Sequence, residues 1–145
     1  MTLFGIPFLF EEIPLQMNFM YKYHRGEKLQ RTTPKISSTT IPAFNPVEDL
    51  PGTDRGRAFI ELWNDNRSQL NASGEILLDQ NKDEWTLGQI KIANYNYLKK
   101  PNYIAVGFTA SKDGELFTGA DGSFIIVDEI KLIYHKQGKG SIKIK

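Results

Sequence analysis

Residues 56–64 read Gly-Arg-Ala-Phe-Ile-Glu-Leu-Trp-Asn, and the alternation in this stretch decides the fold class. Successive side chains of a β-strand point to opposite faces, so a pattern of period two predicts a strand with one buried face. One face would carry aliphatic side chains, and the other would carry two aromatic rings and a carboxylate. The two sets are Ala58, Ile60 and Leu62, and Phe59, Glu61 and Trp63.

Six further stretches have the same strand character. They are rich in β-branched and aromatic residues and are bounded by Gly, Asn, Asp and Pro clusters, whereas helical periodicity is nearly absent. These stretches are residues 4–10, 16–23, 75–79, 85–93, 103–110 and 123–134. The last contains Ile125, Ile126 and Val127 and is predicted to be a buried central strand. The sequence therefore predicts an all-β protein built as an antiparallel β-sandwich.

The connections are predicted from proline, glycine and polar residues. Residues 28–55 hold four of the seven prolines, which rules out a helix and favours a long extended loop that crosses between the sheets. Residues 64–73 are rich in Asn and Ser and are predicted to form an exposed loop. Asp-Gly pairs predict turns at residues 112–115 and 120–123.

The composition limits the domain number and the class of partner. With 145 residues the chain fits one domain, which we place over residues 1–136 with a flexible tail over residues 137–145. Lys and Arg total 18 and Asp and Glu 17, so a net charge of +1 gives no global attraction to nucleic acid or to acidic lipid. Cysteine is absent, which excludes disulfides and thiolate metal sites. No apolar run approaches the roughly 20 residues that a membrane helix needs, so direct membrane insertion is not expected.

The chain resembles the putative carbohydrate metabolism domain family, and the last third carries the most specific motifs. That segment, from Lys100 to Tyr134, contains Ser111-Lys112, Phe117-Thr-Gly-Ala120, Gly122-Ser123 and Val127-Asp-Glu129. Residues 5–8 and 20–23 resemble the opening of the family, and residues 54–63 resemble its middle strand. Leu116 and Phe124 depart from the family pattern at positions where neither change threatens the fold.

This resemblance implies a sandwich of jelly-roll type, similar to galactose-binding domains and carbohydrate-binding modules. It also implies an oligo- or polysaccharide as the partner. Members of the family stand at the C-terminus of exported, often lipid-anchored proteins of glycan-degrading gut bacteria, usually behind an immunoglobulin-like domain. We therefore expect an extracytoplasmic location, in the periplasm or at the cell surface. The first ten residues read poorly as a signal peptide, so an export signal would lie upstream.

Four residues are candidate sugar contacts. Sugar recognition combines flat aromatic surfaces with planar polar side chains that bond to hydroxyl groups. Trp63 and Asn64 supply this pair at a predicted strand end, and Tyr95 and Tyr97 supply aromatic rings in a loop rich in Asn. Two alternatives remain open: Trp63 would cap the core, and the loop would be a turn in which Asn side chains bond to the backbone.

Asp128 is the candidate metal ligand. It lies in an otherwise apolar predicted strand, where an unpaired charge is costly. Either it accepts hydrogen bonds from a neighbouring loop such as residues 111–114, or it binds a structural calcium together with loop carbonyls. We expect no other cofactor.

Catalysis is the less favoured interpretation, and no residue is predicted to be catalytic. A glycoside hydrolase needs two carboxylates across a cleft, for which Glu61 with Glu75 or Asp79 is the candidate pair. No nucleophile elbow, phosphate loop or zinc motif is present in the sequence. The prediction is a non-catalytic, glycan-binding or glycan-associated surface domain that serves bacterial polysaccharide utilisation. The alternatives are a structural module that docks on a protein partner in a surface complex, through edge strands and the proline-rich loop, and a glycoside hydrolase.

Overall fold

The computed structural model describes residues 5–9, 12–35, 43–64, 67–96, 99–137 and 141–144. Nearly all regular structure in these residues is β. The strands are β1 (Ile6–Pro7), β2 (Gln16–His24), β3 (Gln30–Arg31), β4 (Glu48–Asp49), β5 (Gly56–Asn64), β6 (Gln69–Leu78), β7 (Lys82–Lys91), β8 (Ala93–Asn94), β9 (Tyr103–Thr109), β10 (Thr118–Gly119), β11 (Phe124–Gln137) and β12 (Ser141–Ile144). A short 3-10 helix, η2, spans Gly114–Leu116. Within the described residues, no helix has the length and apolar character needed to cross a membrane.

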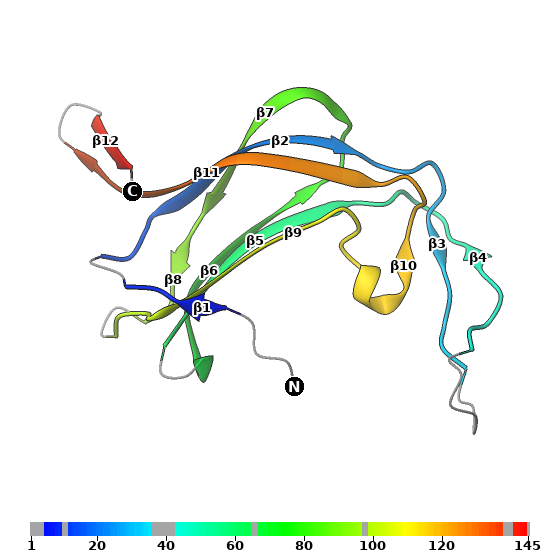
Figure 1. The fold of residues 1–145 in the computed structure, drawn as a ribbon, viewed down its shortest axis with the longest axis horizontal. Helices are drawn as coiled ribbons and strands as arrows, with labels where there is room; N and C mark the ends of the chain where they lie inside the picture. The colour runs from blue at the N-terminus through cyan, green and yellow to red at the C-terminus, as the bar shows by residue number, and fades with distance from the viewer. Residues whose placement is uncertain are drawn as a thin grey trace.

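Two antiparallel sheets face each other as layers (Figure 1). The order is β1-β9-β5-β6-β8 in the five-stranded sheet and β12-β11-β2-β7 in the four-stranded sheet. The long strands pair in a nested way, because β11 pairs with β2 while β9 pairs with β5. The chain also crosses between the sheets after β1, β2, β6, β7 and β9. This nested pairing with repeated crossings is the arrangement of a jelly roll, so the predicted fold class is confirmed.

The core lies between the inner faces of β2 and β5. Each strand shows strict alternation of buried and partly exposed residues, as the sequence pattern predicts. The buried side chains at its centre are Met17, Phe19, Tyr21, Tyr23, Ala58, Ile60 and Leu62. Full burial of one of the larger apolar side chains contributes roughly 1.5–3 kcal/mol, so this cluster dominates the stability of the sandwich. Because the inward positions of β5 are fixed by the core, its outward positions are fixed too.

The predicted exposed loop over residues 64–73 is wrong in its second half. Residues 69–73 belong to β6, which pairs with β5 from Gln69 to Leu78. A bulge near Asn71 lets this polar stretch pair, and Asn71 is fully buried with its Nδ2 donating to the carbonyl of Lys99 at 2.8 Å. Composition predicted a loop because Asn and Ser favour turns, but pairing with a long neighbouring strand overrides that preference.

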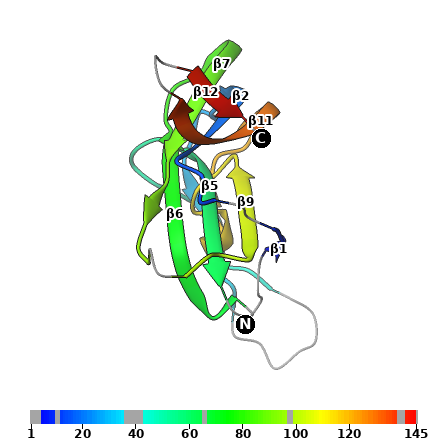
Figure 2. The same cartoon turned by 90° about the vertical axis from the view of Figure 1, so that its left-hand side faces the viewer.

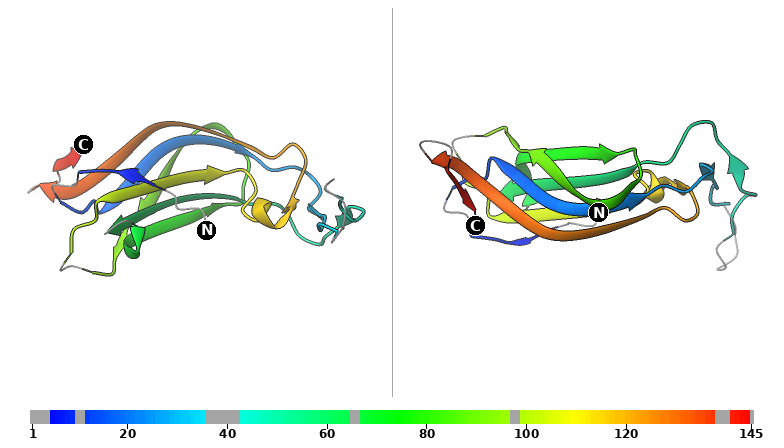
Figure 3. Two further views of the ribbon diagram at one scale, coloured as in Figure 1. Left: turned by 60° about the horizontal axis from the view of Figure 1, so that its bottom comes forward. Right: turned by 90° about the horizontal axis from the view of Figure 1, so that it is seen from above.

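The proline-rich stretch crosses between the sheets as predicted, yet its described part is not a plain loop. β3 and β4 form a three-stranded sheet with β10, in the order β10-β3-β4, which extends beyond the end of the sandwich (Figures 1 and 3). We call this extension the arm. A further bridge joins Pro34 and Phe44, and the ring of Phe44 meets that of Phe117 with centroids 5.5 Å apart.

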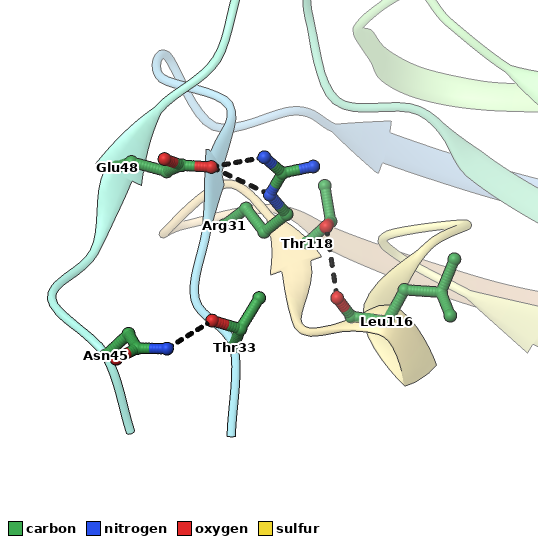
Figure 4. A network of polar contacts seen from close by, with 6 residues as sticks. All are labelled: Arg31, Thr33, Asn45, Glu48, Leu116 and Thr118. Carbon is green, nitrogen blue, oxygen red and sulfur yellow. Dashed lines mark hydrogen bonds and ion pairs between the residues drawn. The ribbon is translucent and has the colours of Figure 1, made fainter. Parts of the chain in front are cut away.

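Side-chain hydrogen bonds hold the arm together, because a single layer has no core of its own (Figure 4). Arg31 on β3 forms an ion pair with Glu48 on β4. Next to it, Asn45 Nδ2 donates to Thr33 Oγ1 at 2.7 Å. On the β10 side, Thr118 Oγ1 donates to the carbonyl of Leu116 at 3.2 Å. The sequence did not predict these contacts, since β3, β4 and β10 have only two residues each.

β11 differs from the predicted buried central strand. Only its inner face packs on the core, and Ile126 on the outer face is 47% exposed. The predicted tail also contributes a strand, because Ser141–Ile144 pair with the end of β11. At the other end of the chain, the predicted strand over residues 4–10 reduces to Ile6–Pro7 within the described residues. The predicted turn at residues 120–123 is confirmed, with Gly122 at a φ of 84°.

Candidate functional site

The outer face of β5 is the candidate site. Its residues between the buried positions point away from the core, because strand side chains alternate. They are Arg57, Phe59, Glu61 and Trp63, and all four are partly exposed. β5 lies between β6 and β9 (Figure 2). No further layer of described strands covers the outer side of these three strands (Figure 3, left).

Phe59 lies over β9 because its partner in the register is Gly107. A Cβ atom at residue 107 would stand 2.2 Å from Cε1 of the Phe59 ring, so no side chain fits there without moving the ring. The guanidinium of Arg57 lies over the same ring, with Cζ 4.4 Å from the centroid. The position of Phe59 therefore depends on a glycine and in turn supports a cation.

Arg57 is held from a second side by Glu75 on β6. Its Nε donates to Glu75 Oε2 at 2.6 Å, and its side chain remains 36% exposed. The two terminal NH2 groups have no hydrogen-bond partner among the residues that the structure describes. A guanidinium is a rigid planar donor that suits pairs of oxygen atoms. Arg57 thus presents fixed donors to a ligand on this face.

Two hollows flank β5 and share three of its residues. The first encloses about 430 Å³ toward β6 and β8, and the second about 570 Å³ toward the loop after β9. The shared residues are Arg57, Phe59 and Glu61. Other polar residues that line the first hollow are Ser73, Glu75, Lys91 and Tyr95. Those that line the second are Thr109, Ser111, Lys112 and Glu115.

Two of the predicted sugar contacts come together on this face. Trp63 Nε1 donates to Glu61 Oε2 at 3.0 Å. Tyr95 is 61% exposed, and its hydroxyl lies 2.8 Å from Ser73 Oγ. Ser73 is the register partner of Glu61. Trp63 and Tyr95 are therefore hydrogen-bonded to two residues that lie opposite each other on neighbouring strands. Trp63 stands at the end of the face and is partly exposed, so both its role as a sugar contact and the alternative that it caps the core stay open.

The other two predicted contacts do not reach this face. Asn64 points inward, is 2% exposed, and donates from Nδ2 to Gln69 Oε1 at 3.2 Å. It follows the same alternation as Leu62, so its side chain offers a ligand almost no surface. Tyr97 lies outside the described residues.

A buried carboxylate positions the wall of the second hollow. Asp54 is 3% exposed, and its Oδ2 accepts hydrogen bonds from Ser111 Oγ at 2.5 Å, Ser123 Oγ at 2.7 Å and Ala120 N at 3.0 Å. These donors bracket the segment that carries η2 and β10. Sequence reasoning missed Asp54 because an acidic residue just before a strand usually lies in a solvated turn.

The same carboxylate acts on Tyr23 in the core. The Tyr23 hydroxyl donates to the carbonyl of Ala110 at 3.0 Å, beside Ser111. Burial raises the pKa of Tyr23 to about 12, and the charge of Asp54 acts in the same direction. Tyr23 therefore stays neutral at physiological pH and keeps its hydroxyl as a donor to the end of β9.

Asp128 does not have the surroundings that the sequence predicted. It is exposed, and its Oδ1 accepts a hydrogen bond from the backbone N–H of Glu129 at 2.8 Å. Loop donors such as Ser111 bond to Asp54 instead. The register partner of Asp128 is Met20, which supplies no oxygen ligand. The described part of the chain holds no group of three or more His, Cys, Asp or Glu residues that could bind a metal. A calcium bound by Asp128 together with loop carbonyls stays a prediction.

The predicted carboxylate pair is partly realised. Glu61 and Glu75 both line the first hollow, whereas Asp79 lies beyond β6 beside Arg25 and Arg55. Glu75 is the register partner of Phe59, two residues along β6 from Ser73. Diagonal neighbours on adjacent strands lie about 7–8 Å apart, so the two side chains are close enough to approach each other. Each carboxylate already accepts a hydrogen bond, Glu61 from Trp63 and Glu75 from Arg57.

The centre of the face, Arg57 with Phe59, was not singled out from the sequence. The signal was available, because the alternation in residues 56–64 places Phe59 on the same face as Glu61 and Trp63. One more step of that alternation adds Arg57. What the sequence could not supply is Gly107, which lies far along the chain and makes room for the ring.

Solved structures with the same fold come from Bacteroides species. One is described as a putative glycoside hydrolase from Bacteroides thetaiotaomicron, with a TM-score of 0.68 and 24% identity over 94% of this chain and 42% of that chain. Another is described as a putative glycoside hydrolase from Bacteroides vulgatus, with a TM-score of 0.59 and 19% identity over 88% of this chain and 54% of that chain. The chain thus spans about half the length of these proteins, and the likeness shows the fold.

Comparison of sequences gives the family. No curated protein sequence matches the chain. A family model does match, and it covers residues 1–133, which include the five-stranded sheet with the whole outer face of β5, and β2, β7 and most of β11 in the other sheet. The protein is therefore carbohydrate-related, and the chain belongs to the putative carbohydrate metabolism domain family.

Proposed function

We propose that this domain binds glycans on the outer face of β5 without cleaving them and acts outside the cytoplasm in bacterial polysaccharide utilisation. The observation that carries the proposal is the position of Arg57, Phe59 and Glu61, which line two hollows at once. Membership of a carbohydrate-related family supports a sugar as the partner. The extracytoplasmic location rests on the family resemblance.

The chemistry of this face suits hydroxyl-rich ligands. The free NH2 groups of Arg57 can donate to two neighbouring sugar oxygens, and the carboxylates of Glu61 and Glu75 can accept from hydroxyl groups. Trp63 and Tyr95 provide apolar surface at the edges, where the C–H side of a sugar ring can pack. The contacts that hold Arg57 to Phe59 and Glu75 fix it before a ligand arrives, which reduces the entropy lost on binding.

A glycan array with soluble polysaccharides and oligosaccharides tests the proposal. The wild-type domain should bind at least one class of glycan, and Arg57→Ala should weaken that binding about 10- to 100-fold, because a charged hydrogen-bond donor is lost. Arg57→Lys should weaken it by a similar factor, since Lys keeps the charge but loses the planar donor pair.

Lys22→Ala is the matched control. Lys22 also lies over an aromatic ring, with its Nζ 5.3 Å from the centroid of Trp85, but on the outer face of the other sheet. Its removal should leave binding unchanged. An equal loss in both variants, or a wild-type domain that binds no glycan, would contradict the proposal.

Glycoside hydrolysis is the second candidate, favoured by the two carboxylates in the first hollow and by the description of the structural relatives. Hydrolysis would be the function if the domain released reducing ends from the bound glycan and if Glu61→Gln and Glu75→Gln each abolished that release. We expect no release of reducing ends. The assembly role on the arm and the edge strands predicts that no glycan binds, so the array separates it from both.

A further inference from the structure

The two hollows on the outer face of β5 adjoin each other. They share Arg57, Phe59 and Glu61, so these three side chains form the boundary between them. The first reaches Tyr95 beyond β6, and the second reaches Glu115 in η2. Pockets of roughly 300–1,000 Å³ accommodate drug-sized ligands, so each hollow has room for its own sugar units. The pair forms a trough across the sheet.

The charges that line the trough are balanced. In the first hollow Arg57 and Lys91 stand with Glu61 and Glu75. In the second, Arg57 and Lys112 stand with Glu61 and Glu115, and Lys112 Nζ already lies 2.5 Å from Asp113 Oδ2. The lining of each hollow carries two cations and two anions, and Asp113 beside Lys112 adds a further anion, so the trough has no excess of positive charge that would attract an acidic ligand. A balanced set of donors and acceptors instead matches uncharged hydroxyl groups.

We propose that the trough binds an internal segment of an uncharged polysaccharide, which lies across β6, β5 and the loop after β9 and fills both hollows. The inference rests on the proposed function and specifies the ligand: a neutral chain, recognised along its length and not at its end. Arg57 then bonds to the middle of the segment, while Tyr95 and Glu115 contact sugar units on either side.

Calorimetry with defined oligosaccharides tests this inference. The probes are cellohexaose, xylohexaose and mannohexaose, their disaccharides, and hexagalacturonate as the acidic counterpart. At least one neutral hexasaccharide should bind about tenfold or more tightly than its disaccharide, because a filled second hollow adds at least about 1.4 kcal/mol. This binding should not change between low and high salt, since no ion pair forms with the ligand.

Variants at the two ends of the trough sharpen the test. Tyr95→Ala and Glu115→Ala should each remove most of the gain with chain length, while variants of the other sheet such as Lys22→Ala keep it. Equal affinity for disaccharide and hexasaccharide would overturn the inference and leave the proposed function standing. Salt-dependent binding of hexagalacturonate alone would overturn the neutral ligand. Failure of every probe and of every polysaccharide on the array would overturn both proposals.

Discussion

The two outer faces of the sandwich each carry a cation over an aromatic ring, yet they differ in everything around that pair. On the five-stranded sheet, Arg57 over Phe59 is flanked by hollows and by carboxylates. On the four-stranded sheet, Lys22 over Trp85 lies among apolar side chains. Of these, Trp85 is 46% exposed, Leu87 53%, Phe124 49% and Ile126 47%.

The difference arises from the neighbours in the register. Phe59 faces Gly107, so its ring lies low and leaves space on both sides. On the other sheet the neighbours are large: Met20 pairs with Leu87, and Ile126 pairs with Lys22. Large neighbours fill the surface and offer few polar groups. A small residue opposite an aromatic residue thus leaves room for hollows on the face of a sheet.

The largest effect on stability is expected for Asp54→Ala, and Asp128→Ala in the other sheet is its comparison. Asp54→Ala should lower the free energy of unfolding by about 3 kcal/mol, because the buried N–H of Ala120 and two serine hydroxyls lose their acceptor. Asp128→Ala should lower it by no more than about 0.5 kcal/mol, since Asp128 is exposed. Urea denaturation of both variants measures the difference. Equal losses would contradict the assignment of Asp54 as the residue that holds the wall of the second hollow.

Gly107→Ala should have the next largest effect. Its Cβ would collide with Phe59, so we expect a loss of about 1–3 kcal/mol in stability together with weaker glycan binding. Gly114→Ala, at a position with open space around the new Cβ, should change stability by less than about 0.5 kcal/mol. Thermal unfolding with and without glycan gives both quantities. A stable Gly107→Ala variant with full binding would show that the position of Phe59 does not matter.

Tyr23→Phe tests the core between the two faces. At pH 7 the loss of the hydrogen bond to Ala110 should cost about 1 kcal/mol. Tyr23 ionises near pH 12 when folded but near pH 10 when unfolded, so the folded state binds more protons between these values. The stability that Tyr23 contributes is therefore present below pH 10 and falls above it, by up to about 1.4 kcal/mol per pH unit. The stability advantage of the wild type over the variant should vanish near pH 11 and reverse before pH 12. A gap that stays constant over this range would contradict the raised pKa.

The smallest effect is expected on the apolar face. Lys22→Ala removes a cation over an exposed ring, which contributes about 0.5–1 kcal/mol, and should leave glycan affinity as it is. Denaturation and the glycan array check the two halves of this prediction. A stability loss as large as that of Asp54→Ala would mean that the two faces are not as different as their surroundings indicate.

The sequence predicted the parts of the molecule that depend on local pattern. Residues 16–23 and 56–64 were predicted as strands, and the alternation in residues 56–64 predicted that one face of this strand is buried. It failed where distant residues decide. The polar residues 69–73 form a strand only because β5 lies beside them, and the arm exists only because β10 reaches β3.

The candidate site, like the fold, was predicted only in part from the sequence. Trp63 and Tyr95 were chosen for their residue type, and the structure brings both to one face. Asn64 was chosen in the same way, but alternation turns it inward. Asp54 accepts the loop hydrogen bond that was predicted for Asp128, for a reason that no local pattern contains: the serines that it binds stand 57 and 69 residues away from it.

The most direct test of the central claim is a map of backbone amide shifts on addition of the best-binding glycan. Our account predicts that the perturbed amides cluster in β5, in residues 73–75 of β6 and in the loop after β9, and that Arg57→Ala abolishes them. A cluster on β2, β7 and β11, around Trp85 and Ile126, would place the glycan on the opposite face and contradict the account.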